Sequence, residues 1–168
     1  MERIHHYDSP LGGITLSCAG GALTGLWFDG QKHFGSTMSA EAEEGHADVF
    51  DDADKWLDIY FSGRQPDFMP QIRLIGTDYQ KAVWQILLTI PYGNTLTYGQ
   101  LARMAAESIG NTGFSARAAG NAVARNPVSL IVPCHRVIGA DGSLTGYAGG
   151  KDRKKMLLDM EIKSCGIL

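Results

Sequence analysis

The sequence of 168 residues has few cysteines and no long hydrophobic run. Its three cysteines, Cys18, Cys134 and Cys165, are an odd number without regular spacing, which argues against a disulfide framework and for free thiols in a reducing compartment. No apolar stretch approaches the roughly 18 residues that a membrane helix requires. The polar start, MERIHHYDSP, also lacks the apolar core of a signal peptide. These absences lead us to expect a cytoplasmic location.

The chain as a whole has no excess of positive charge, since 15 Lys+Arg against 18 Asp+Glu give a formal net charge of −3. This average conceals a difference between the two halves. Residues 1–75 carry 5 Lys+Arg and 12 Asp+Glu, whereas residues 76–168 carry 10 Lys+Arg and 6 Asp+Glu, so their net charges are −7 and +4. A basic second half favours an acidic partner for that half only, although two solvated surfaces of chance composition are an equal alternative.

The first part of the chain predicts a small sheet and one helix. In residues 14–18, apolar and polar side chains alternate as in a half-buried strand, and CAGGAL then supplies a Gly-Gly turn into a second strand, LTGLWF. A helix is expected after residue 48 because apolar side chains recur on one face. These side chains are Val49, Phe50, Ala53, Trp56, Leu57, Tyr60 and Phe61.

Metal binding is an alternative function for this first part. His5, His6, Cys18 and His33 are all potential ligands. Their spacing matches no compact zinc motif. We therefore interpret them as scattered side chains that hold no metal.

The second half of the chain predicts consecutive helices. Thr77 with Gln80, and Thr97 with Gln100, each form a capping-box pattern that marks a helix start. The segment before a third helix, ESIGNTGF, is longer than the tight turn of a standard helix-turn-helix motif. A last helix is expected from about residue 151, with three apolar side chains buried: Met156, Leu157 and Met160.

The third helix, ARAAGNAVAR, is almost without large side chains. Ser115 is its candidate cap, and Asn126-Pro127 would end it. So slim a helix permits another backbone to approach closely, which is compatible either with DNA or with tight packing against a neighbouring helix. Arg117 and Arg125 lie eight residues apart on it, somewhat over two turns, and cations at that spacing suit phosphate contact.

The segment VPCHRV, residues 132–137, surrounds Cys134 with groups that can act on a thiol. Pro133 removes a backbone donor and argues against a central strand. His135 supplies a candidate base and Arg136 a fixed positive charge, and both increase the thiolate fraction of a neighbouring cysteine. Because no other histidine follows residue 46, any imidazole base of the second half must be His135.

Two reactions fit this Cys–His pair. Hydrolysis through a thioester requires an oxyanion hole and a route for water. Transfer of an alkyl group to sulfur gives a thioether without an easy leaving group, so a protein that used its own cysteine in this way would be consumed. The pair alone does not distinguish between them. Cys18 and Cys165 are expected to be ordinary packing residues.

Four segments of the second half carry a resemblance to a known family: IPYGNTLTYGQLA, ARAAGNAVARNP, IVPCHRVIGADGSLTGYAGG and KKMLLDMEI, in that order. Together they resemble the bacterial methylated-DNA–protein-cysteine methyltransferases, the O6-alkylguanine-DNA alkyltransferases. The resemblance implies an α/β plus mostly α fold. Residues 1–70 would form a small-sheet, ribonuclease H-like α/β domain, residues 71–76 a linker, and residues 77–168 a winged-helix-like domain with a helix-turn-helix.

The resemblance implies four catalytic residues. Cys134 would accept the alkyl group. His135 would deprotonate Cys134 through a water, and Glu161 would orient the imidazole. Tyr98 would donate a proton to the departing purine, because an anionic guanine is a poor leaving group.

Several residues are implied in binding the DNA itself. Arg117 would fill the space left by a nucleotide flipped out of the duplex, since sulfur cannot reach an alkylated base within the stack. The small residues of its helix, including Ala118, would enter the minor groove. Asn126 would brace the turn that joins this helix to the cysteine segment.

A further set is implied in holding the flipped base. Tyr147, Ala148 and Gly149 would line its pocket, and the main-chain carbonyl groups of Cys134 and Val137 would bind the guanine amino group. The glycines of GYAGG would let this loop fold closely over a flat base. Ala148 stands where some relatives have serine, which leaves a main-chain donor for the guanine oxygen and bears on substrate preference.

The implied function is irreversible, stoichiometric transfer of an alkyl group from O6-alkylguanine, and less readily from O4-methylthymine, to Cys134. The partner would be alkylated double-stranded DNA, bound through its minor groove by a monomer, and no cofactor is implied. Some relatives hold a zinc ion in the N-terminal domain, but we expect no metal because this sequence has no clear ligand set.

Two other functions are compared with this one. A module that only marks lesions is disfavoured, because alkyltransferase-like proteins of that kind have tryptophan where Cys134 stands. A cysteine hydrolase would turn over many substrate molecules per protein, which a titration can detect.

Overall fold

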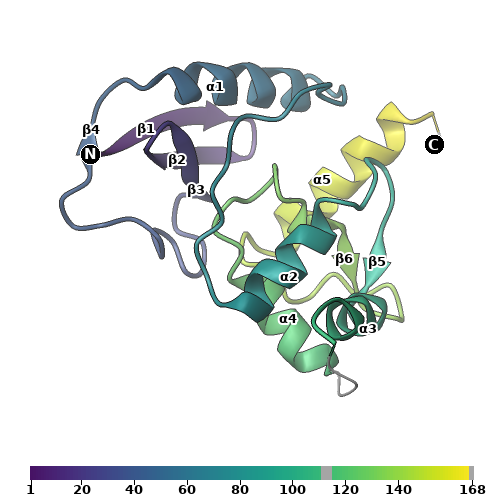
Figure 1. Cartoon of the computed structure of the whole chain (residues 1–168). Coiled ribbons are helices and arrows are strands. Elements are labelled where there is room, and N and C mark those ends of the chain that lie inside the picture. The colour runs from purple at the N-terminus through teal and green to yellow at the C-terminus, as the bar shows by residue number, and fades with distance from the viewer. Residues whose placement is uncertain (111–114, 167–168) are drawn as a thin grey trace. The chain divides into compact units, whose positions relative to one another are not determined.

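The computed structural model describes residues 1–110 and 115–166 (Figure 1). The chain separates into two compact units. One comprises Met1–Ile75 with Pro127–Ser129, and the other comprises Gly76–Asn126 with Leu130–Leu168. Among the described helices, none combines the length and the apolar character that crossing a membrane requires.

The first unit is built on a four-stranded sheet of order β3-β2-β1-β4. Its strands are β1 (Glu2–Ser9), β2 (Gly12–Ala19), β3 (Ala22–Phe28) and β4 (Glu43–Glu44). β2 and β3 form the antiparallel hairpin that the Gly-Gly turn predicts, which confirms that part of the sequence analysis. β1 also pairs with β2, antiparallel along its whole length, although its polar sequence gave no strand prediction.

The strand predicted from the alternation in residues 14–18 is present as part of β2, and both of its faces are buried there. Thr15 and Ser17 are 4% and 0% exposed, and the apolar residues that alternate with them are buried as well. Their hydroxyl groups find partners inside the unit: Thr15 donates to Asp29 at 2.7 Å, and Ser17 lies 2.9 Å from the Thr24 hydroxyl. Hydrogen-bonded hydroxyls can be buried at little cost, so alternation did not indicate exposure here.

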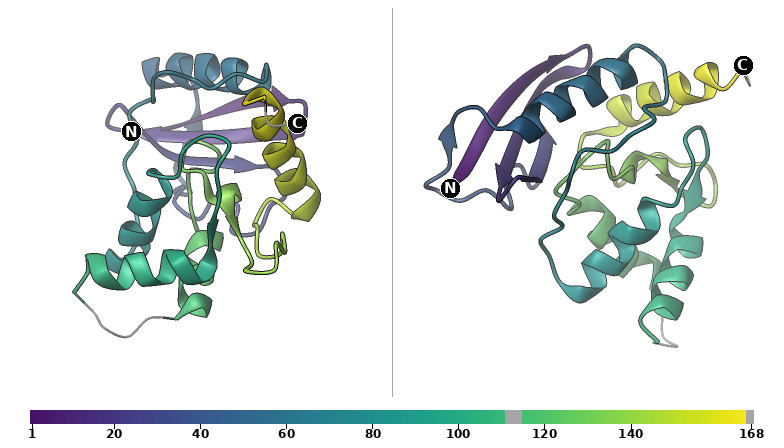
Figure 2. Two further views of the ribbon diagram at one scale, coloured as in Figure 1. Left: turned by 90° about the vertical axis from the view of Figure 1, so that its right-hand side faces the viewer. Right: turned by 45° about the horizontal axis from the view of Figure 1, so that its top comes forward.

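The helix α1 (Asp48–Phe61) lies along one face of the sheet in Figures 1 and 2. Six of the seven side chains predicted for its apolar face are buried, and only Phe61 is partly exposed. Two segments from later in the chain hydrogen-bond to β3. Leu23 exchanges backbone hydrogen bonds with residues 71–73, the segment assigned to the linker, and Leu26 does so with residues 127–129.

The second unit contains four α-helices, one 3₁₀ helix and one short parallel strand pair among its described residues. Its elements are α2 (Asp78–Leu87), β5 (Leu96–Thr97), α3 (Tyr98–Ser108), α4 (Ala116–Ala124), a 3₁₀ helix (Cys134–Arg136), β6 (Val137–Ile138) and α5 (Lys151–Ser164). Both predicted capping boxes are present, at Thr77 and Thr97, and Ser115 caps α4. Four residues of the long joint before α4, 111–114, lie outside the described part of the chain.

The buried face of α5 differs from the prediction. Met156 is 56% exposed and Met160 is partly exposed, whereas Leu157 is buried as expected. The other buried residues of α5 are Lys154, Leu158 and Glu161. Residues 154, 157, 158 and 161 follow the i, i+3, i+4, i+7 spacing of a helix face. A hydrophobicity pattern misplaced this face because a lysine and a glutamate stand at two of its four positions.

Candidate active site

The cysteine segment is a tight turn. Pro133 has φ −82° and ψ 66°, close to an inverse γ-turn, and the Cys134 amide donates to the Val132 carbonyl at 2.8 Å. The 3₁₀ helix that follows keeps Cys134, His135 and Arg136 all buried, and Cys134 itself is 3% exposed. This turn agrees with the expectation that Pro133 excludes a central strand.

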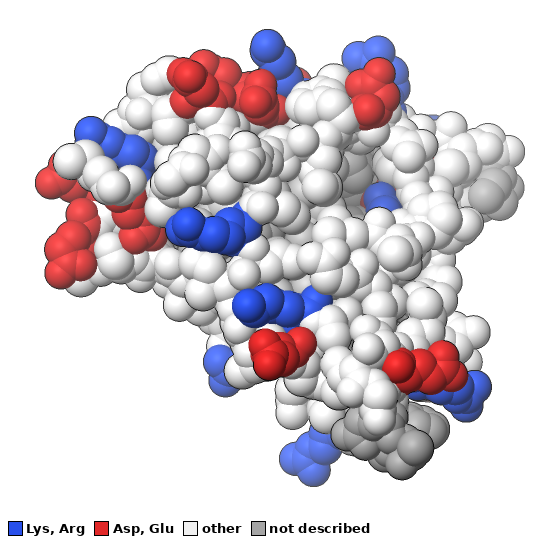
Figure 3. Space-filling view, viewed as in Figure 1, with Lys and Arg blue, Asp and Glu red and all other residues white. Residues whose placement is uncertain are grey.

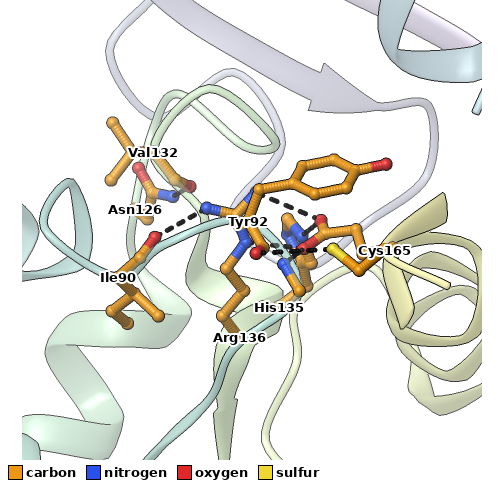
Figure 4. A network of polar contacts seen from close by, with 9 residues as sticks. Ile90, Tyr92, Asn126, Val132, His135, Arg136 and Cys165 are labelled. Atoms are coloured by element: carbon orange, nitrogen blue, oxygen red, sulfur yellow. Dashed lines mark hydrogen bonds and ion pairs between the residues drawn. The ribbon is translucent and has the colours of Figure 1, made fainter. Parts of the chain in front are cut away.

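Asn126 supports the same turn from the end of α4. It is 3% exposed, and its side-chain amide donates to the Val132 carbonyl at 2.8 Å (Figure 4). The Val132 oxygen therefore accepts from both Asn126 and Cys134. Asn126 is more than a helix stop, because its side chain connects α4 to the residue two positions before Cys134.

Glu161 receives four hydrogen bonds at the centre of the site. His135 Nε2 lies 2.6 Å from Oε2, and Arg136 donates from Nε to Oε1 at 2.8 Å and from Nη2 to Oε2 at 3.2 Å. The Gly93 amide donates to Oε1 at 3.0 Å. Glu161 is 0% exposed, so it is a buried carboxylate and not a solvated side chain on the helix surface.

The charges in this cluster favour an ionised Glu161 and a neutral His135. Burial alone would raise the pKa of Glu161, but the hydrogen bonds from His135 and Arg136, together with the charge of Arg136, outweigh it and hold the pKa well below its usual range. Burial lowers the pKa of His135, and this effect exceeds the opposing influence of Glu161. A neutral imidazole whose Nε2–H donates to Glu161 leaves Nδ1 as the basic nitrogen.

Arg136 and Gly93 were not predicted to hold Glu161. Arg136 also donates from Nη1 to the Ile90 carbonyl at 2.8 Å, and its guanidinium lies 5.5 Å from the centre of the Tyr92 ring (Figure 4). Gly93 has φ 82°, and a Cβ there would lie 2.6 Å from the Cys165 sulfur. The Pro91–Gly93 turn can therefore approach α5 closely only with glycine at this position.

Tyr98 is positioned by the short parallel pair of β5 and β6. Leu96 pairs with Val137, so Tyr98 at the start of α3 is brought to the segment that follows Cys134. Its hydroxyl donates to the Thr145 carbonyl at 3.0 Å. Burial raises the pKa of Tyr98 to about 12, with a further contribution from the charge of Cys134. The phenol therefore stays protonated and can act as a donor throughout the neutral range.

The glycine-rich loop packs on two tyrosines. A Cβ on Gly146 would lie 2.8 Å from the Tyr98 hydroxyl, and one on Gly149 would lie 2.5 Å from the Tyr147 ring. Tyr147 is 7% exposed, its ring is edge-on to His135, and its buried hydroxyl has no hydrogen-bond partner among the described residues. Ala148, between Tyr147 and Gly149 in the sequence, is partly exposed. The loop thus packs against Tyr98 and His135 with little room for larger residues at its glycine positions.

The helix α4 has a packed side and an exposed side. Ala119, Ala122 and Val123 are buried, and the Trp84 indole donates to the Ala122 carbonyl at 2.8 Å. Arg117, Ala118 and Arg125 are exposed. Both interpretations of this slim helix therefore have support, because one side packs on its neighbours while the side with the arginines is open.

Positive charge is dispersed on one face of this unit. In the view of Figure 3, its Lys and Arg side chains lie singly and are interspersed with Asp and Glu, without a continuous basic area on that face. This pattern agrees with the modest net charge of +4 for residues 76–168.

The structure does not gather the four potential metal ligands of the first unit. His5 is hydrogen-bonded to Asp54 and His6 to Glu44, and Cys18 is buried. Among the described residues, one other set has donor atoms within 4.8 Å of one another. It consists of the exposed side chains His46, Asp48 and Asp51. His46 is already paired with Asp51 at 3.0 Å, and we assign no metal to this set.

Comparison with known proteins identifies the family. Residues 3–74 match the 6-O-methylguanine DNA methyltransferase, ribonuclease-like domain, and residues 78–163 match the DNA binding domain of the same family. A methylated-DNA–protein-cysteine methyltransferase of Mycobacterium leprae (strain TN) is 46% identical over 161 residues, which are 96% of this chain and 93% of that protein.

Solved structures agree with this result. Mycobacterium tuberculosis OGT in complex with DNA has a TM-score of 0.82 and 42% identity, with 96% of this chain and 94% of that chain covered. The O6-methylguanine-DNA methyltransferase of Pyrococcus kodakaraensis has a TM-score of 0.62 and 26% identity, with 96% and 99% covered. The two-domain architecture, a sheet domain followed by a helical DNA-binding domain, is thus shared, and the chain belongs to the methylated-DNA–protein-cysteine methyltransferases, a family of DNA-repair enzymes.

Proposed function

We propose that this protein repairs DNA by moving a methyl group from O6-methylguanine irreversibly to Cys134, once per protein molecule. The observation that carries this proposal is the buried cluster in which Cys134 is followed by a neutral His135 bonded at 2.6 Å to an ionised Glu161. In a member of this family, the cluster is suited to convert a buried thiol into a nucleophile. O4-methylthymine is proposed as a poorer substrate.

The proposed reaction begins with loss of the Cys134 proton. His135 would take it through a bridging water, using the ring nitrogen that does not bond to Glu161. The thiolate sulfur would then form a bond to the methyl carbon while the bond between that carbon and guanine O6 breaks. The electron pair would remain on the purine, and Tyr98 would supply the proton that neutralises it. The product thioether has no easy route back to a thiol, so the protein would be consumed.

Base flipping follows from the burial of the acceptor. With 3% of Cys134 exposed, a base that stays in the stack cannot reach the sulfur, and the lesion would have to be extruded from the duplex. We assign Arg117 to the space that the extruded nucleotide leaves, and Ala118 to the minor-groove surface of α4. Both are exposed on the open side of that helix.

The remaining binding roles are proposals of the same kind. Arg125, exposed at the end of α4, would contact phosphate, and Asn126 would couple this helix to the cysteine turn. Tyr147, Ala148 and Gly149 would surround the flipped base, whose amino group would meet the main-chain carbonyl groups of Cys134 and Val137. Because Ala148 offers no hydroxyl, a main-chain amide would serve the guanine oxygen.

Finer features of the architecture are also proposed from the family. We interpret the N-terminal unit as a ribonuclease-like domain, and α3 with α4 as the helix-turn-helix of a winged-helix domain. A monomer acting without a cofactor accounts for the proposed chemistry. The described cysteines are all free thiols, which fits the reducing conditions of a cytoplasm.

The test is the intact mass of the protein after incubation with duplex DNA that contains O6-methylguanine. The wild type should gain one methyl group, and Cys134→Ala should gain none. A gain in Cys134→Ala would show that the acceptor is misassigned. Tight binding of the lesion without any change in protein mass would favour a lesion-marking module instead.

A further inference from the structure

Lys154 is an unusual residue on the buried face of α5. Its side chain is 0% exposed, whereas lysines are almost never fully buried without a paired charge. Among the described residues, no carboxylate lies within ion-pair distance of its ammonium group. A charge that is buried in this way normally costs stability, so its contacts must offset that cost.

Within the described part of the chain, the contacts of the Lys154 ammonium group lie at the proposed reaction centre. Its Nζ donates a short hydrogen bond to the Val137 carbonyl. Nζ also lies 3.5 Å from the Tyr98 hydroxyl and 5.5 Å from the centre of that ring. Val137 opens β6 directly after the cysteine turn, and Tyr98 follows its partner strand β5. One ammonium group therefore connects α5 both to the segment that follows Cys134 and to the start of α3.

We propose that Lys154 is a positioning residue for methyl transfer, which holds the Val137 carbonyl and the Tyr98 phenol around Cys134 and places a positive charge beside the reacting thiolate. This inference rests on the proposed function, because both Val137 and Tyr98 act there on the flipped guanine. The Val137 oxygen retains a second lone pair for the guanine amino group while it accepts from Lys154.

The electrostatic part of the inference has independent support. Burial lowers the pKa of Lys154 to about 8, and the charge of Cys134 opposes this shift. Coupling between two titrating groups is reciprocal, so the ammonium must favour the Cys134 thiolate as much as the thiolate favours the ammonium. With a pKa of about 8, Lys154 is still mostly protonated at pH 7.

The other groups that face this pair do not supply the same charge. From the cysteine turn, His135 is neutral, and Arg136 is bound to Glu161 of α5. From α3 and the glycine-rich loop, Tyr98 and Tyr147 both have raised pKa values because they are buried, and both are neutral near pH 7. Arg153, which also influences Tyr147, donates to the Gly149 carbonyl at 3.2 Å.

The test compares Lys154→Met with Lys155→Met. Lys155 is the adjacent lysine of the same helix, but its side chain is 66% exposed and is paired with the exposed Asp159, so this control should behave like the wild type. Lys154→Met should transfer methyl at least about tenfold more slowly at pH 7, which corresponds to the loss of one charge-assisted contact in the transition state. Its melting temperature should change by only a few degrees, since removing a buried charge relieves desolvation.

A second measurement separates charge from structure. The rate at which iodoacetamide modifies Cys134, followed by peptide mass mapping, reports the thiolate fraction without DNA. We expect the midpoint of this pH profile to move upward by about one unit in Lys154→Met and to return most of the way in Lys154→Arg. An unchanged midpoint together with an unchanged transfer rate in Lys154→Met would overturn the inference.

The inference stays testable if Lys154→Met does not fold. In Cys134→Ser, which has no thiolate, the pKa of Lys154 measured by NMR should be lower than in the wild type, and equal values would overturn the electrostatic role. None of these thiol and NMR measurements needs methylated DNA. Failure of the wild type to gain a methyl group would contradict the proposed function, whereas a methylated wild type with an unaffected Lys154→Met would contradict only the role of Lys154.

Discussion

The His135 Nε2 atom lies 2.6 Å from Oε2 of Glu161, although 26 positions separate the two residues. The contact joins the cysteine turn to α5 and is sealed from solvent on both sides, because each residue is 0% exposed. Arg136 and the Gly93 amide also donate to the Glu161 carboxylate. These hydrogen bonds help to hold the carboxylate in position for His135. The following predictions test this arrangement and the surfaces around it.

Glu161→Gln should destabilise the protein by about 3–5 kcal/mol at pH 7, because it leaves Arg136 buried without its counter-ion. The folded-state pKa of Glu161 lies below that of the unfolded chain, which is about 4.3. Its ionised form therefore adds stability above pH 4.3, and this contribution is lost as the pH falls through the folded pKa. The difference in unfolding free energy between Glu161→Gln and the wild type, measured in urea, should therefore narrow steadily below about pH 4.

Asp159→Asn is the matched control for this experiment. Asp159 lies on the same helix, half-exposed, and pairs with Lys155 at 2.6 Å. Exposed ion pairs contribute between about 0 and 1 kcal/mol, so Asp159→Asn should lower the free energy of unfolding only slightly at every pH. If Glu161→Gln lowers the free energy of unfolding no more than Asp159→Asn does, the buried carboxylate does not stabilise the site.

His135→Asn should slow methyl transfer by about 10²–10⁴-fold, the usual contribution of a general base, with little change in DNA affinity. In the wild type, burial lowers the pKa of His135, so the neutral base should persist below its ordinary pKa of about 6.5. Single-turnover rates measured from pH 5 to 8 should consequently show no loss centred at 6.5. An acid limb at that pH, or a rate in His135→Asn near that of the wild type, would argue against the assignment.

Tyr98→Phe should reduce the transfer rate by about 10-fold or more while the protein remains folded, because it removes the proton donor but keeps the ring. Tyr79→Phe is a suitable control, since Tyr79 is a partly exposed residue of α2. Rapid-quench kinetics on a methylated duplex would measure both. If Tyr98→Phe matches Tyr79→Phe, the phenol does not protonate the purine.

Asn126→Ala should lower the free energy of unfolding by about 1–3 kcal/mol, because the buried Val132 carbonyl loses a donor. Asn121, on the exposed side of α4, provides the comparison, and Asn121→Ala should change stability by less than about 0.5 kcal/mol. Equilibrium urea unfolding distinguishes the two. Equal changes in unfolding free energy for the two variants would mean that the Asn126 side chain does not stabilise the cysteine turn.

Much of the framework could be predicted from sequence because local patterns determine it. The Gly-Gly hairpin, the apolar face of α1, the two capping boxes and the Ser115 cap are all present. Each depends on residues a few positions apart, so the physical cause lies within one window of sequence. Cys134 and His135 were also found in this way, since an unusual neighbourhood of proline, histidine and arginine marks them.

The features that sequence reasoning missed depend on contacts between distant segments. Nothing local indicates that Arg136 binds Glu161 and the Ile90 carbonyl, or that the Gly93 amide completes the carboxylate. Glu161 was reached only through the family resemblance. Lys154 was passed over because a lysine on a helix is normally solvated. A heptad-like analysis of α5 that allowed polar residues on the buried face would have found residues 154 and 161 together.

The most direct test of the central claim is a titration of the protein with excess duplex DNA that contains O6-methylguanine. Methyl groups on the protein and restored guanine in the DNA are both counted. We predict a plateau at one methyl group per chain, located on Cys134 by peptide mapping, with an equal amount of guanine restored. Guanine that continues to form beyond one equivalent, or a methylated residue other than Cys134, would contradict the account.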